Sequence, residues 1–114
     1  MEGAVSNENA QHYRWGDGCD GWHLVDQGTL SVIQERVPPG KSEKPHYHES
    51  SRQFFFVLDG TATLEIDGKN VIVKEREGIE VPPKVRHLLR NNSNADLVFL
   101  VISSPRSHSD RVNI

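Results

Sequence analysis

The sequence predicts an all-β domain, either a sandwich or a barrel. Short runs rich in branched and aromatic residues follow one another, and turn-forming residues interrupt them at intervals of about 8 to 12 residues. No window has the 3.6-residue periodicity of an amphipathic helix, and there is no internal repeat. The 114 residues suffice for a single domain whose core needs no disulfide, since Cys19 is the only cysteine.

The N-terminal part is expected to hold a flexible segment, a loop and two strands. Residues 1–12 are polar and predict a flexible N-terminal segment, which places the folded domain at residues 13–114. Residues 14–22 contain three glycines and two aspartates, which favour an ordered, tightly turned loop. Its two tryptophans, Trp15 and Trp22, are expected to pack against another part of the protein. Leu24 and Val25 fit a short strand, and residues 29–37 a better one that ends before two prolines and a glycine.

The strands that follow are separated by clear turn signals. Residues 54–58, 61–66 and 70–74 predict a meander, with Asp-Gly pairs at 59–60 and 67–68 as its turns. Residues 78–83 are expected to turn the chain into a strand at 85–89, and 97–102 predict a fully buried strand. Residues 103–109 are polar and are expected to leave the barrel.

The charge pattern argues against nucleic-acid and membrane partners. Thirteen basic and sixteen acidic residues give a net charge of −3, with neither a basic stripe nor a polybasic run. The first ten residues form no apolar signal segment, and no 18-residue apolar run occurs. A cytoplasmic protein is therefore the default expectation.

Two separate parts of the chain carry four potential metal ligands: His46, His48, Gln53 and His87. Alternate side chains of a strand share one face, so His46 and His48 can reach the same ion. Gln53 begins a run in which it shares a face with Phe55, and it can face the same cavity. Imidazole nitrogens with an oxygen donor suit one divalent transition metal such as Zn, Ni, Fe or Mn, and coordination positions would remain for a ligand.

These residues resemble the two signatures of the cupins, which are small jelly-roll barrels also called double-stranded β-helices. The first signature is matched by Gly40, His46-Tyr47-His48, Gln53 and Gly60, with glutamine where glutamate is usual, and the second by Gly78, Pro82-Pro83-Lys84, His87 and Asn91. The resemblance covers residues 29–102. It implies a single cupin-type domain in which His46, His48, Gln53 and His87 occupy the four metal-ligand positions.

The resemblance narrows the function less than the fold, because cupins include dioxygenases, isomerases, decarboxylases, lyases and non-catalytic proteins. We expect a metal-dependent enzyme that acts on a sugar acid, keto acid or enediol, by Lewis-acid isomerisation or ring opening or by oxygen-dependent cleavage. The alternative is a cupin that only binds a small ligand or sugar. With glutamine at position 53, the sequence resembles cupins that open unsaturated uronate rings. Those enzymes also use an aspartate on the last strand, whereas residues 97–102 contain no acid.

The sequence identifies no catalytic acid or base beyond the ligands. Arg52, next to Gln53, and Phe55, on the face of Gln53, are the candidates for substrate contacts. The strand at 54–58 is apolar on both faces, so its outer face must be covered by the second sheet, by the segment of Trp15 and Trp22 or by another subunit. Of these we expect another subunit, in a homodimer. The other histidines, His12, His23 and His108, are expected to be surface residues.

Overall fold

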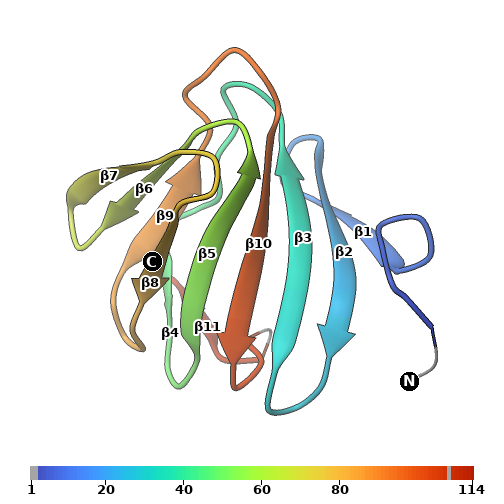
Figure 1. Cartoon of the computed structure of the whole chain (residues 1–114). Coiled ribbons are helices and arrows are strands. Elements are labelled where there is room, and N and C mark those ends of the chain that lie inside the picture. The colour runs from blue at the N-terminus through green and yellow to red at the C-terminus, as the bar shows by residue number, and fades with distance from the viewer. Residues whose placement is uncertain (1–2, 108) are drawn as a thin grey trace.

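The computed structural model describes residues 3–107 and 109–114, and this part of the chain consists of eleven strands and their connections (Figure 1). The strands form two antiparallel sheets that pack face to face. One has the order β1 (Gln11–Trp15), β2 (Cys19–Asp26), β3 (Ser31–Val37), β10 (Leu97–Ser104), β5 (Arg52–Asp59), β8 (Gly78–Val81). The other has the order β11 (Arg111–Asn113), β4 (His46–His48), β9 (His87–Arg90), β6 (Ala62–Ile66), β7 (Lys69–Val73). The all-β prediction is confirmed.

The inner face of the six-stranded sheet supplies one half of the core. Burial alternates along β10, so that Leu97, Phe99, Val101 and Ser103 point inward. The register aligns these side chains with inward residues of β3 and β5, which produces three rows across the sheet: Ser31–Ser103–Gln53, Ile33–Val101–Phe55 and Glu35–Phe99–Val57. These rows set which side chains face the opposite sheet and its histidines.

The segment at residues 14–22 is part of a hairpin, so the expectation of a loop there was wrong. Strands β1 and β2 pair from Gln11 opposite His23 to Trp15 opposite Cys19. Gly16 and Gly18 take positive φ angles of 54° and 79° in the tight turn, while the residues on either side pair regularly. Strand β1 begins at Gln11, before the start at residue 13 that the sequence predicts for the domain. Met1, Glu2 and His108 lie outside the described residues, so the predictions for them, including a surface position for His108, stay predictions.

Two short strands were not predicted. Strand β8 has four residues and pairs with β5, where the sequence indicated a turn. Strand β11 has three residues and pairs with β4, placing Arg111 opposite His48. Segments this short carry little periodicity, so their pairing with a neighbouring strand determines their conformation.

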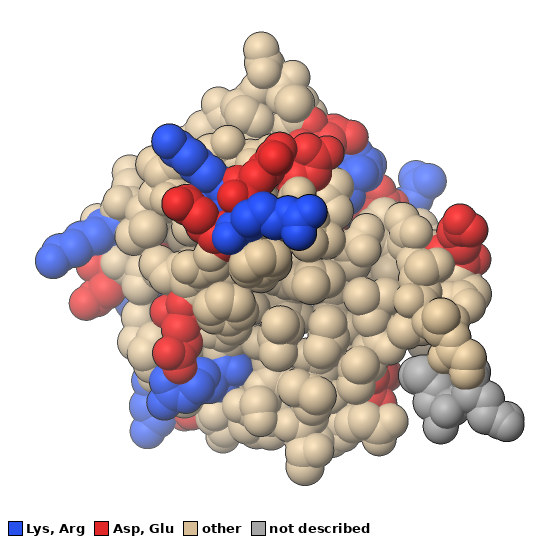
Figure 2. Space-filling model, in the orientation of Figure 1, with Lys and Arg blue, Asp and Glu red and all other residues tan. Residues whose placement is uncertain are grey.

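The outward side of the six-stranded sheet carries a second set of apolar side chains. Phe54 lies opposite Ile102, Phe56 lies opposite Leu100, and the two phenylalanine rings stack at 6.3 Å. Phe54 is 39% exposed. Figure 2 views this side of the molecule and shows charged residues around its margin with an uncharged centre. We call the set Phe54, Phe56, Leu58, Leu100 and Ile102 the outer apolar face.

Within the described residues, no helix is long and apolar enough to cross a membrane.

Candidate metal centre

Pairing between β4 and β9 brings three histidines together. His46 and His48 lie on the same face of β4, and the register places His46 opposite His87 of β9. One nitrogen from each of the three rings lies within 4.8 Å of the other two, and all three side chains are buried. The structure therefore gathers the three histidines that the sequence singled out, at a spacing that one metal ion can span.

Hydrogen bonds fix the orientation of each ring. His46 Nδ1 lies 2.8 Å from the Lys44 carbonyl oxygen, and His87 Nδ1 lies 2.9 Å from that of Val85. A carbonyl oxygen only accepts, so in both rings Nδ1 carries the proton and the neutral imidazole presents a lone pair at Nε2. His48 Nδ1 bonds to Asp110 Oδ1 at 2.9 Å. A ring nitrogen held by a carbonyl or carboxylate is the usual outer partner of a metal-ligating histidine.

Gln53 approaches this group from the other sheet. Its Oε1 lies 3.2 Å from His87 Nε2, and its Nε2 donates to Ser103 Oγ at 3.1 Å and lies 3.5 Å from Ser107 Oγ. With the proton of His87 on Nδ1, both Nε2 and Oε1 are acceptors and no hydrogen bond joins them. Two buried acceptors this close are stabilised by a shared cation, so the residues present fit a metal ion.

The electrostatics favour the ligand form of the histidines. Burial lowers the pKa of His46 to about 3 and also lowers the pKa of His48 and of His87. All three rings are therefore neutral at neutral pH. Burial alone would raise the pKa of Asp110, but backbone N–H donors from Ser50 and Ser51, at 2.9 and 2.8 Å, bring it below its usual value. Asp110 is ionised and accepts a hydrogen bond from the N–H group at His48 Nδ1.

His46, His48 and Gln53 open onto a cavity of about 220 Å³ between the sheets. Apolar side chains form its middle, polar groups lie around them, and the lining is Tyr13, Ile33, Glu35, Glu43, His46, His48, Gln53, Phe55, Val101, Ser107 and Arg111. Drug-sized ligands use cavities of roughly 300–1,000 Å³, so this one suits a molecule of only a few carbon atoms.

Two carboxyl groups lie in this cavity besides the candidate ligands. Tyr13 Oη donates to Glu35 Oε2 at 2.8 Å, and the backbone N–H of Leu89 donates to Glu43 Oε1 at 3.0 Å. Burial raises the pKa of Glu35 to about 7, and burial together with the nearby Glu35 raises the pKa of Glu43 to about 8. Burial and Glu35 also raise the pKa of Tyr13. We call Tyr13, Glu35 and Glu43 the acid end of the cavity.

The two residues named from sequence as substrate contacts lie in different places. Phe55 is buried in the cavity wall, with its ring 6.0 Å from that of His87 in an edge arrangement. Arg52 is exposed and paired with Glu80. It borders a different hollow, of about 190 Å³, on the outward side of the sheet with Phe54 and Ile102.

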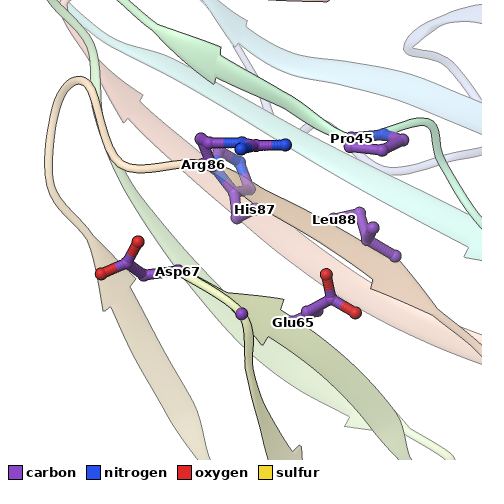
Figure 3. A pocket seen from close by; sticks show the side chains of 7 residues that line it. Pro45, Glu65, Asp67, Arg86, His87 and Leu88 are labelled. Atoms are coloured by element: carbon purple, nitrogen blue, oxygen red, sulfur yellow. The ribbon is translucent and has the colours of Figure 1, made fainter. Parts of the chain in front are cut away.

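Another hollow, of about 260 Å³, lies beside β6 and β9 (Figure 3). Glu65 and Asp67 come from β6 and its turn, and Arg86 from the approach to β9. His87 borders this hollow, but one of its ring nitrogens bonds to the Val85 carbonyl and the other faces Gln53, which lines the cavity between the sheets. The cavity between the sheets is therefore the candidate site.

Sequence reasoning missed the acid end and the partners of the ligands. Glu35 had a usable signal, because it alternates with Ile33 and Val37 and so is an acid on the inward face of a strand. Asp110, Arg111 and Ser107 follow the last apolar strand in a polar segment. No local pattern in that segment indicates that it returns to pair with β4.

Comparison with known proteins agrees with this architecture. A family model described as "Cupin domain" matches residues 33–103. An uncharacterized protein of Methanocaldococcus jannaschii is 32% identical over 81 residues, which are 70% of this chain and 65% of that protein, so this chain spans just under two thirds of its length. The oxalate-binding protein of Thermotoga maritima is 30% identical over 104 residues, 86% of each protein. The solved structure of KdgF from Halomonas sp. has the same fold at a TM-score of 0.85 and 17% identity, with 96% of this chain and 98% of that one aligned. The chain belongs to the cupin family.

Proposed function

We propose that this cupin holds one divalent transition metal through His46, His48, His87 and Gln53, and acts as a metalloenzyme on a small oxygenated molecule. The observation that carries the proposal is the pair of acceptors, His87 Nε2 and Gln53 Oε1, 3.2 Å apart beside two further buried imidazoles. When bound, the metal supplies Lewis acidity, which polarises an oxygen of the ligand, and Fe would in addition permit oxygen-dependent cleavage.

The chain's own residues support catalysis beyond metal binding. Asp110 and two backbone carbonyls orient the rings, and burial keeps them neutral. Ile33, Phe55 and Val101 exclude water from the middle of the cavity, where electrostatic interactions are strengthened. Tyr13, Glu35, Glu43 and Arg111 supply polar groups in the same space, as an enzyme needs for orienting a substrate.

Of the two Lewis-acid reactions in this proposal, uronate ring opening has less support than isomerisation. The likeness to KdgF concerns the fold, and β10 carries no acid where the resemblance calls for an aspartate. A small acid as ligand is supported by the Thermotoga maritima relative, which is named an oxalate-binding protein. That name also favours the alternative function, a non-catalytic cupin that binds a small ligand, which would show no metal-dependent turnover.

The test of the metal site is metal content measured by inductively coupled plasma mass spectrometry on protein purified without chelators. Wild type should hold about one equivalent of Zn, Ni, Fe or Mn per chain. His48→Ala should lose most of it because one of three buried imidazoles is gone, whereas His12→Ala on β1 should keep it. Full occupancy in His48→Ala would refute the assignment.

We also propose that two copies associate through the outer apolar face. Its aromatic and aliphatic side chains adjoin one another across β5 and β10, and large contiguous apolar patches usually mark interfaces. Light scattering after size exclusion should give twice the chain mass, and Phe54→Glu should give a monomer. A monomeric wild type at micromolar concentration would contradict this.

A further inference from the structure

We propose that the acid end recognises hydroxyl groups of the ligand, so that the protein prefers a small hydroxy acid with one carboxylate to a dicarboxylate of the same length. This inference rests on the proposed function, because it assumes that metal-bound oxygens hold the ligand's other end. It names the substrate class and assigns Tyr13, Glu35 and Glu43 as specificity-determining residues.

The two carboxyl groups are incompletely paired. Glu35 accepts from Tyr13 through Oε2, and Glu43 accepts from Leu89 through Oε1. Among the described residues, no hydrogen bond reaches Glu35 Oε1 or Glu43 Oε2, although both side chains line the cavity. An acceptor in a cavity that lacks a protein donor is satisfied by a donor on water or on a ligand.

The backbone around Tyr13 is arranged for this contact. In the register of the sheet, Gly21 lies between Tyr13 on β1 and Glu35 on β3. A Cβ at position 21 would lie 2.2 Å from Tyr13 Cζ, so the ring occupies the space that any other residue's side chain would need. The missing side chain allows the Tyr13 hydroxyl to reach across a strand and hold Glu35.

The middle of the cavity separates this end from the histidines. Ile33, Val101 and Phe55 form one row across the inner face, between the row of Gln53 and the row of Glu35. Adjacent inward rows are about 7 Å apart, the distance between alternate residues of a strand. A carbon skeleton can lie against this apolar row while its ends reach polar groups of different kinds.

Charge decides which polar groups fit. A ligand hydroxyl can donate to a carboxylate or accept from a protonated carboxyl, so it suits the acid end in either state. At a pH above the raised pKa values of about 7 for Glu35 and about 8 for Glu43, both groups are ionised and repel a second ligand carboxylate. Arg111, which also lines the cavity, can pair with one negative charge of the ligand.

The experiment is calorimetric titration of the metal-loaded protein with matched acids at pH 9, where Glu35 and Glu43 are both ionised. Glycolate is compared with oxalate, and glycerate with tartronate, so that a hydroxymethyl group replaces one carboxylate at constant carbon number. Wild type should bind the better hydroxy acid at least tenfold more tightly than its dicarboxylate partner. Glu35→Gln and Glu43→Gln should each reduce this ratio at least threefold, mainly by improving dicarboxylate binding. Glu80→Gln, outside the cavity, should leave the ratio unchanged.

The outcomes separate this inference from the proposed function. Metal content is measured on every variant, and the glutamine variants should retain about one equivalent. If the metal is present and dicarboxylates bind as tightly as hydroxy acids, if neither class binds, or if Glu35→Gln and Glu43→Gln leave the ratio unchanged, the inference is wrong while the metal site stands. If wild type takes up no metal, the proposed function and this inference fall together.

Discussion

The two ends of the cavity differ in the kind of ligand group that they can bind. At the histidine end every ring has a partner for its Nδ1 atom, and the remaining ring lone pairs suit a cation. At the acid end each carboxyl accepts one hydrogen bond from the described residues, and its other oxygen suits a hydroxyl donor. One cavity can therefore hold a cation at one side and hydroxyl groups at the other, and each end can be altered separately.

The largest expected effect comes from the outer partner of His48. Asp110 accepts from His48 Nδ1 and from the backbone of Ser50 and Ser51, and asparagine has only one acceptor oxygen for these donors. Asp110→Asn should lower metal affinity about 10- to 100-fold. Competition with a chromophoric chelator measures this, with Asp59→Asn as control. Unchanged affinity would mean that His48 needs no such support.

Filling the space at Gly21 should disrupt the acid end alone. Gly21→Ala forces the Tyr13 ring away from Glu35 and should lower the free energy of unfolding by about 1 to 3 kcal/mol. Tyr13→Phe removes only the hydroxyl and should cost about 1 kcal/mol. Both variants should keep full metal content. Loss of metal in either would show that the two ends are coupled.

The pH dependence of stability should distinguish the acid end from the histidine end. The pKa of Glu43 is about 8 when folded against an ordinary 4.5, so folded protein loses stability as pH rises from about 4.5 towards 8. Glu43→Gln removes this loss. Urea unfolding of metal-free protein should find the variant more stable by about 1 to 3 kcal/mol at pH 8 relative to its difference at pH 4, a range discounted for solvent in the cavity. The histidine contributions are common to both proteins and cancel, so a pH-independent difference would be inconsistent with a buried, protonated Glu43.

The smallest effect is expected outside the cavity. Arg52 and Glu80 form an exposed pair, and such pairs contribute below about 1 kcal/mol. Arg52→Ala should therefore leave metal content and ligand affinity unchanged and barely alter the unfolding midpoint. A clear loss of ligand binding would restore Arg52 as a substrate contact.

Local rules were sufficient to predict the all-β class and the shared face of His46 and His48. Asp-Gly turns and branched runs mark strands, and the spacing of His46 and His48 places them on one face whatever the neighbours are. The resemblance to cupins placed His87 in the same site as His46 and His48, and the structure brings the three rings together.

The acid end needs information that is not local. Tyr13 meets Glu35 only because β1, β2 and β3 pair in one register with a glycine between them. The turn residues at 16–18 indicated a loop, although they connect two paired strands. The pairing of β11 with β4 is still harder to predict from the sequence, because only one of the three residues of β11 is apolar.

The pairing of β11 with β4 also has a consequence for how firmly His48 is held. Its carboxylate partner, Asp110, stands immediately before β11, a strand of three residues that pairs with β4 at the edge of the sheet. Short edge strands open locally at a lower free energy than the centre of a sheet. Local opening of β11 should therefore release the ring of His48 while the rest of the barrel stays folded.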